Sequence, residues 1–345
     1  MTTTTTASPK ADVDGEILAK QSRSAFSAFF ERFGLLGLLV ILIIVFSILL
    51  PGLFLTPANL NAIGLSQSVL AVAAIALVFP LVGGRFDISI GANLGLCSIV
   101  VASVMSKNDL PLPIAILAGV GTGIAIGLLN GILVAYLGIN AIIATLGIAT
   151  VITGVVQAYT QGIPVSSNIS PTLTGLSGVL IVGIPLLFIV MLILAAIAWF
   201  ILTKSTYGRY LFAVGSNANA ATLVGLPIRR IILLSFVIAG AFAGIGGVMQ
   251  VAAQGNGNPQ VGGIPYILPA LAAVFLGATT FKPGTYNIPG TIVGLLFIGT
   301  ATSGLALLGV ETWVTDVFNG GAVVVAVGLS AYFRRRRTGV ITLGE

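Results

Sequence analysis

Residues 35–52 have the sequence LLGLLVILIIVFSILLPG, an apolar run without a charged side chain. A helix that spans a membrane needs about 20 mainly apolar residues, with a range of about 17–25. Runs of this kind recur along the rest of the chain. We therefore predict an all-α, polytopic membrane protein with ten transmembrane helices, over residues 35–52, 60–82, 88–105, 113–136, 140–159, 179–202, 231–253, 266–281, 286–308 and 313–333.

The composition supports this class of protein. Of the 345 residues, 57% are hydrophobic and only 7% are charged, whereas a typical soluble domain has about 25% charged residues. So little charge cannot cover a water-facing surface, which argues against a soluble enzyme, a nucleic-acid binder or a disulfide scaffold. The chain has no His and one Cys, Cys97, so we expect no catalytic residue, no metal site and no internal disulfide.

The basic residues indicate how the chain is oriented. Twelve of the 15 Lys and Arg residues fall in three segments, 1–32, 203–230 and 334–337, and such segments lie in the cytoplasm. Even numbers of predicted helices separate them, as a common side requires. We expect a disordered cytosolic tail over 1–32, a transmembrane domain over 33–333 with a cytosolic loop at 203–230, and a basic cytosolic tail over 334–345.

Two of the ten segments are weaker than the others. Residues 88–105 and 266–281 adjoin Gly- and Pro-rich stretches, which are tolerated at membrane depth only against protein or a water-filled cavity. A chain in which neither segment crosses, with eight transmembrane helices, is also consistent with the charge distribution.

Glycines recur every four residues in segment 113–136, at Gly119, Gly123, Gly127 and Gly131. This spacing keeps them on one face of a helix, and small residues allow helix backbones to approach closely in membranes. We predict that this face packs tightly against another helix. The alternative is a face that slides when the protein changes conformation.

Polar residues within or beside the apolar segments are the candidates for a solute pathway. They are Asp87, Ser89, Asn93, Asn130 and Thr145. Asp87 is costly at membrane depth unless it is paired or hydrated, so it has three possible roles: an ion pair with Arg85, a cap for the next helix, or contact with a solute. The uncharged side chains would suit a neutral polyhydroxylated solute, but such residues also hydrogen-bond between helices.

The cytosolic loop contains helix signals. Ser216 can begin a helix, Gly225 can end it, and Pro227 prevents its continuation, which predicts a helix over 217–224. One face of that helix would be small and uncharged, formed by Ala218, Ala220, Ala221 and Leu223. Such a face suits docking in a groove of another protein, with a plain capped loop as the alternative.

Three motifs resemble those of the permease subunits of bacterial ATP-binding-cassette sugar importers, the ribose, xylose, arabinose and galactofuranose type. Residues 84–91 are similar to a Gly-Gly-Ile-Asp-Leu-Ser-Val-Gly signature, and Asn130-Gly131 with residues 143–147 to an Asn-Gly and Ile-Ala-Thr-Leu-Gly pair. The third motif is the cytosolic segment, and the resemblance covers residues 35–333. It implies that the residues coupling to an ATPase are Gly208, Arg209, Ala213, Gly215, Asn217, Ala220, Ala221 and Gly225.

The resemblance also implies the partners and the mechanism. Two ATPase subunits would dock on the cytosolic loop, a periplasmic or lipid-anchored binding protein would deliver the solute, and a second permease chain, identical or similar, would complete the pathway in the bacterial inner membrane. The chain would bind no cofactor, and ATP would be used by the ATPase. The chain itself has no Gly-x4-Gly-Lys-Ser/Thr loop, because Thr203 precedes its only Lys-Ser pair, Lys204-Ser205.

The solute implied is a ribose-like monosaccharide imported by alternating access, but the sequence departs from the family pattern. Arg85 stands where Gly or Glu is usual, Ala141-Ile142 where Pro-Phe is common, and Leu226-Pro227 at the end of the coupling segment. A polyol, a nucleoside or a branched-chain amino acid therefore remains an alternative. An ion-coupled secondary carrier is a further one, disfavoured because the membrane segments hold or border only three acids, Asp87, Glu311 and Asp316.

Overall fold

A computed structural model describes residues 32–338, without the side chains of residues 264, 265 and 329–338. The tail expected over 1–32 lies outside this range except for Arg32, as do residues 339–345 of the tail expected at the C-terminus. Residues 334–338, which we expect in that tail, instead continue the last helix.

Each of the ten predicted segments coincides with a helix, which confirms the all-α class. The helices are Arg32–Leu49, α2 (Pro57–Val82), α3 (Ile90–Ser106), α4 (Leu112–Ala135), α5 (Ala141–Thr160), α7 (Leu186–Lys204), α10 (Ile228–Gln254), α11 (Gly263–Gly277), α12 (Ile288–Leu307) and α13 (Thr312–Thr338). Within the described range, seven are long and apolar enough to span a membrane, while α3, α11 and the apolar part of α13 are shorter. The number of crossings therefore stays a prediction.

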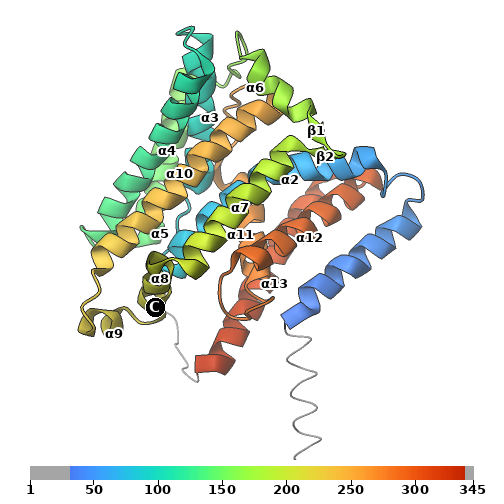
Figure 1. Ribbon diagram of the computed structural model, residues 1–345. Helices are drawn as coiled ribbons and strands as arrows, with labels where there is room; N and C mark the ends of the chain where they lie inside the picture. The colour runs from blue at the N-terminus through green and yellow to red at the C-terminus, as the bar shows by residue number, and fades with distance from the viewer. Residues whose placement is uncertain (1–31, 339–345) are drawn as a thin grey trace, which may run out of the picture.

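Helix α2 forms the centre of the molecule. From Ala71 to Phe79 no side chain is more than 2% exposed, and α2 contacts α7, α10, α11 and α12. A helix that is apolar on all sides needs apolar surroundings, either protein or lipid, and around the middle of α2 the neighbouring helices provide them. In Figure 1, α3, α4, α5 and α10 lie on one side of α2, and α12 and the N-terminal helix lie on the other.

Glycines bring α4 close to its neighbours. A Cβ atom added at Gly123 or Gly127 would meet backbone oxygens of α10, those of Gly240 and Phe236. Of the other two glycines in this series, Gly131 also faces α10, whereas Gly119 faces Val101 of α3. A side chain at these positions would push the helices apart, so the small residues set the distance between backbones.

The segment before α7 differs from its prediction. Residues 179–202 were expected as one helix, but its first part forms a hairpin of β1 (Leu180–Ile181) and β2 (Ile184–Pro185), with Leu180 opposite Pro185. Two short helices precede the hairpin, α6 (Pro171–Gly175) and the 3-10 helix η1 (Leu176–Gly178). Helix α7 therefore begins at Leu186, directly after the hairpin, and not at residue 179.

Candidate functional site

The segment predicted to be cytosolic, residues 203–230, contains two short helices, α8 (Thr206–Ser216) and α9 (Ala218–Leu223). Ser205 caps α8, since its Oγ accepts a hydrogen bond from the Gly208 N–H at 3.0 Å. Asn217 caps α9, since its Oδ1 accepts from the Ala220 N–H at 2.9 Å. The predicted helix is thus present, but its cap is Asn217 rather than Ser216, which is the last residue of α8. Helix α8 itself was not predicted.

Three of the predicted coupling residues lie against the protein's own helices. An added Cβ at Gly208 would meet backbone oxygens at the end of α7, and one at Gly215 would meet the backbone oxygen of Val82, at the end of α2. Ala221 is only 4% exposed. These small residues therefore hold α8 and α9 close to the membrane helices. Six of the eight predicted residues are exposed: Arg209, Ala213, Gly215, Asn217, Ala220 and Gly225.

The exposed apolar face of this segment is formed by two residues at the end of α9. Leu223 is 88% exposed and the adjacent Val224 is 74% exposed. The face predicted from sequence is only partly exposed, because Ala221 is buried, and Val224, which the sequence argument missed, is exposed beside Leu223. Docking of a partner on this face stays a prediction. The missed signal is the pair of large apolar side chains directly before the helix-ending Gly225.

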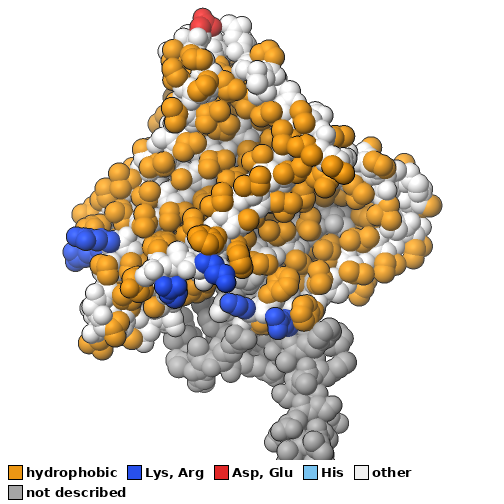
Figure 2. Space-filling model, viewed as in Figure 1, with side chains coloured by type: hydrophobic (Ala, Val, Ile, Leu, Met, Phe, Trp, Pro, Cys, Tyr) orange, Lys and Arg blue, Asp and Glu red, His pale blue; other side chains and the backbone are white. Residues whose placement is uncertain are grey.

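Charged side chains separate along the long axis of the helices. Lys204, Arg209, Arg229 and Arg230 flank or belong to α8 and α9, and Figure 2 shows the Lys and Arg side chains along this lower edge. An acidic side chain appears at the opposite, upper end. In the connector between α3 and α4, Asp109 accepts a hydrogen bond from Asn168, and the cation Lys107, two residues earlier, lies 4.0 Å from the centre of the Tyr159 ring. The wide surface between the two ends is apolar. This distribution matches a protein that crosses a membrane with α8 and α9 in the cytoplasm.

A buried polar cluster surrounds the connector between α2 and α3. Asp87, 3% exposed, accepts hydrogen bonds at Oδ1 from the Ser89 N–H (3.0 Å) and hydroxyl (2.6 Å). The Asn130 amide of α4 donates to Ser89 Oγ at 2.7 Å, and the Ile88 N–H donates to Thr145 Oγ1 of α5 at 3.1 Å. Burial raises the pKa of the Asp87 carboxyl to about 6, partly offset by the bonds from Ser89. The cluster joins three helices where α3 begins.

Asp87 forms no ion pair with Arg85 in the described part of the chain, and Arg85 is exposed. Both bonds to Asp87 come from Ser89, the residue directly before α3, and no side chain of the described residues accepts from an N–H of the first turn of that helix, so Asp87 fixes the connector without capping α3. The fifth polar candidate, Asn93, donates to the Gly123 carbonyl of α4 at 3.2 Å and accepts from the Cys97 thiol. All five candidates are at most 3% exposed. Asn93 and Asn130 hydrogen-bond between elements, whereas both bonds of Asp87 stay within its own connector.

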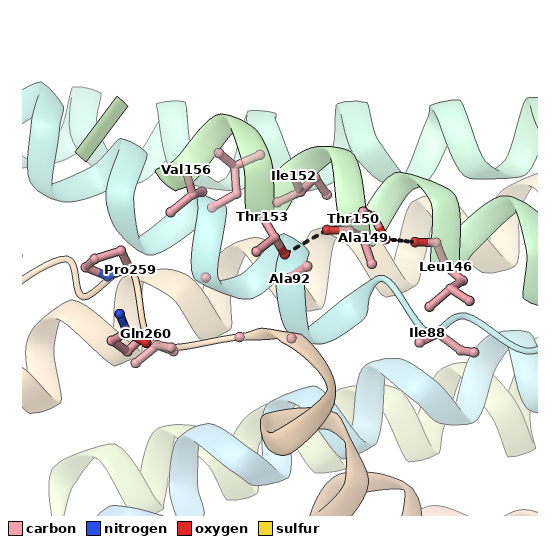
Figure 3. Close-up of a pocket in the computed structure, with 15 residues that line it drawn as sticks. Ile88, Ala92, Leu146, Ala149, Thr150, Ile152, Thr153, Val156, Pro259 and Gln260 are labelled. Atoms are coloured by element: carbon pink, nitrogen blue, oxygen red, sulfur yellow. Dashed lines mark hydrogen bonds between the residues drawn. The ribbon is translucent and has the colours of Figure 1, made fainter. Parts of the chain in front are cut away.

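A pocket of about 420 Å³ lies beside this cluster, between α3, α5 and the loop that precedes α11. None of the five polar candidates lines it. Figure 3 shows Thr150, Thr153 and Val156 of α5 on one wall, with Ala92 of α3 and the Pro259–Gln260 loop facing them. Both threonine hydroxyls donate to carbonyls of their own helix, and each keeps oxygen lone pairs for another donor. Pockets of about 300–1,000 Å³ with a few polar groups are typical of small-molecule sites.

Comparison with known proteins identifies the family. The family model described as the permease component of branched-chain amino acid transport systems matches residues 59–327, which include nine of the ten long helices in whole or in large part. The chain belongs to this permease family. The chain is therefore a multi-pass membrane permease component. The family description names amino acid transport, and the resemblance to sugar-importer permeases read from the three motifs is confirmed by the relatives that follow.

Several curated permeases are similar to this permease over most of its length. They are the D-allose transport system permease protein AlsC of Escherichia coli K12 (33% identical over 285 residues, 83% of this chain and 87% of the relative), the ribose import permease RbsC of the same strain (33% over 286 residues, 82% and 88%) and the L-arabinose ABC transporter permease AraH of Azospirillum brasilense (32% over 284 residues, 82% and 83%). No solved structure matches the permease.

Proposed function

We propose that this permease is the membrane-spanning subunit of an ATP-driven, binding-protein-dependent importer of a ribose-like monosaccharide. The observation that carries the proposal is its similarity, over more than four fifths of the chain, to permeases named for D-allose, ribose and L-arabinose. All three solutes are small polyhydroxylated aldoses. The location that goes with this role is the bacterial inner membrane.

An ATPase subunit would dock on α9. Adjacent large apolar side chains that face water, as Leu223 and Val224 do, are typical of a protein interface. The backbone contact between Gly215 and the end of α2 would carry movement of this segment into the membrane domain. Transport by alternating access requires that ATP and solute each favour one of two conformations, which is a coupling free energy between the two sites.

A second permease chain would complete the pathway along α5. The exposed side of this helix mixes Ile143, Val151 and Val155 with a line of small or polar residues, Gly147, Thr150, Gly154 and Gln157. The exposed side of α7 is apolar along the membrane, with Ile193, Ile197 and Phe200. Polar groups are costly against hydrocarbon, so α7 suits lipid and α5 suits a partner chain or a water-filled passage. The 420 Å³ pocket opens beside Thr150 and Thr153, and we assign the solute to this region.

An ion-coupled carrier remains the alternative from a different class. Proton relays usually place acidic side chains inside the membrane. Among residues 32–338 the only buried acid is Asp87, and both hydrogen bonds given for it come from Ser89. This scarcity favours an energy source outside the chain.

The test is solute uptake by the permease reconstituted in liposomes with its co-encoded ATPase and binding protein. We expect uptake of an aldose such as ribose or allose only when ATP is present on the ATPase side. Uptake of leucine, a polyol or a nucleoside under the same conditions would correct the solute. Uptake driven by an ion gradient without the ATPase would contradict the proposed class.

A further inference from the structure

A second pocket lies at the cytoplasmic boundary of the membrane, apart from the solute region. It has a volume of about 470 Å³ and lies between α7, α8 and the connector from α11 to α12. Its walls include Trp199 and Leu202 of α7, Phe212 of α8, and Phe281 of the connector. The interior is thus formed mainly by aromatic and aliphatic side chains, although the pocket opens at the basic end of the molecule.

Two cations line this pocket from opposite elements, Arg209 of α8 and Lys282 of the connector. The Arg209 guanidinium donates to the Lys204 carbonyl at 3.3 Å and to Thr206 Oγ1 at 3.2 Å, which positions the group and leaves other N–H donors available. Lys204 lies close by, with its ammonium 5.7 Å from the centre of the Trp199 ring. Three cations therefore gather at the rim of a mainly apolar pocket.

The described chain supplies no anion to these cations. Its four acids within 32–338 are Asp87, Asp109, Glu311 and Asp316, and none of them lines the pocket. An anionic ligand would find charge of the opposite sign here together with an apolar surface. Basic pockets between transmembrane helices on the cytoplasmic side are suited to lipid headgroups.

The connector holds Lys282 at a fixed place on the rim. Asn287 donates to the carbonyls of Gly277, Thr280 and Thr285 and accepts from the Gly290 N–H, which closes the connector into a tight loop. The Phe281 N–H and the Thr280 hydroxyl both donate to the Arg32 carbonyl, which ties this loop to the N-terminal helix. Because the backbone is held on both sides, the pocket is formed before any ligand binds.

We propose that this pocket binds the headgroup of an anionic phospholipid of the cytoplasmic leaflet. The phosphate would accept hydrogen bonds from Arg209 and Lys282, since a guanidinium and an ammonium both bind phosphate oxygens. The acyl chains would lie along α7, whose side chains on the membrane side of the pocket, Ile193, Ile197 and Phe200, are 46–59% exposed. A free phosphate shares the headgroup chemistry, but it would make no use of this apolar face.

The experiment measures thermal unfolding of the purified full-length permease in an uncharged detergent. The additives are phosphatidylglycerol, phosphatidylcholine with the same acyl chains, and inorganic phosphate at millimolar concentration. We expect phosphatidylglycerol alone to raise the unfolding temperature, in a saturable way. If phosphatidylcholine raised the unfolding temperature as much as phosphatidylglycerol, the preference for an anionic headgroup would be wrong. If inorganic phosphate did so, the site would bind phosphate and not a lipid.

Lys282→Gln tests the pocket itself. Its side chain is exposed, so the variant is expected to unfold at the wild-type temperature without lipid. Its affinity for phosphatidylglycerol should fall about fivefold, the contribution of one cation near an anionic headgroup, and Lys282→Arg should restore it. Arg230→Gln makes the same charge change on the same side of the membrane, outside the pocket, and should bind as wild type. Equal affinity of Lys282→Gln and wild type would overturn the proposal.

Discussion

At the scale of single residues, one oxygen atom, Asp87 Oδ1, accepts two of the hydrogen bonds that order the connector between α2 and α3. Asp87 Oδ1 accepts both the Ser89 N–H and the Ser89 hydroxyl, and the Ser89 oxygen in turn accepts from Asn130. An amide oxygen could accept the same two bonds. The negative charge is therefore not required by the hydrogen bonds, and burial makes it costly.

Asp87→Asn is expected to fold and to raise the thermal stability at pH 7.5. Burial raises the pKa of this carboxyl from 3.8 to about 6, so the folded wild type is stabilised by the protonated form, and this stability is lost as the pH rises through about 6. The free energy of unfolding of Asp87→Asn should therefore exceed that of the wild type at pH 7.5 by up to about 3 kcal/mol. The advantage of Asn should shrink at pH 5, which thermal unfolding at both pH values measures.

Two results would contradict this account of Asp87. Lower stability of Asp87→Asn at both pH values would mean that the charge itself holds the connector. Asp87→Ala serves as the control, because it removes the acceptor as well as the charge and should be destabilised by about 1–3 kcal/mol. If Asp87→Asn were stable and well folded but had lost solute uptake, Asp87 would act in the solute pathway.

At the scale of helices, packing in the α4 region depends on which side of α4 a glycine occupies. Gly123 faces α10, where the Gly240 carbonyl and the Gly244 backbone leave no space for a Cβ atom. Gly121 lies two residues earlier on the same helix and has nothing within 4 Å of its Cβ position. The two glycines therefore separate the effect of packing from that of helix propensity.

Gly123→Ala should lower the unfolding temperature, because an added methyl group forces α4 and α10 apart at a cost of about 1–3 kcal/mol. Gly121→Ala should be neutral or stabilising by up to about 1 kcal/mol, since Ala is the better helix former. Thermal unfolding of both variants in one detergent makes the comparison. Equal effects of the two substitutions would show that close backbone approach is not what this region requires.

Hydropathy predicts most of the long helices but not the hairpin before α7 or the short helix α8. The ten long helices follow from apolar runs of sufficient length, so their positions agree within a few residues except at the start of α7 and at the end of α13, which continues to Thr338. Before α7, Leu180, Ile181 and Val182 are apolar yet belong to a hairpin, which a hydropathy argument joins to the following helix. Helix α8 was missed although its buried residues, Gly208, Leu211 and Val214, recur at helical spacing after the Ser205 cap.

Polar residues were harder to interpret than apolar ones. Asn93, Asn130 and Thr145 were chosen as pathway candidates because a polar side chain inside a membrane requires a reason. A hydrogen bond to a neighbouring helix is as good a reason as a solute, and only the spatial arrangement distinguishes them. Thr150 and Thr153, which do line the pocket, carry the same chemistry and were not singled out.

At the scale of the whole molecule, the separated charges predict which end lies in the cytoplasm. Native Cys97 is 0% exposed, so it should not react with a maleimide in the folded protein and leaves a silent background. Leu223 marks the basic end and Ile163, which is 67% exposed after the end of α5, marks the other. Single cysteines at these two positions can therefore report the orientation.

In intact spheroplasts, a membrane-impermeant maleimide should label Ile163→Cys and leave Leu223→Cys and the wild type unlabelled. After permeabilisation, Leu223→Cys should be labelled as well, because the reagent then reaches the cytoplasmic side. Labelling of Leu223→Cys in sealed spheroplasts would reverse the proposed orientation. Labelling of the wild type would contradict the burial of Cys97.

The most direct test of the central claim is purification of the tagged permease from its native membranes, with quantification of a co-purifying ATPase by mass spectrometry. We predict an ATPase with a phosphate-binding loop alongside wild type and Ile163→Ser, and at least a tenfold loss with Leu223→Ser/Val224→Ser, because burying a Leu or Val side chain in an interface contributes about 1.5–3 kcal/mol. The double variant should stay folded, since both side chains face water. A folded, monodisperse wild type without an ATPase, or binding unaffected by the double variant, would contradict the account.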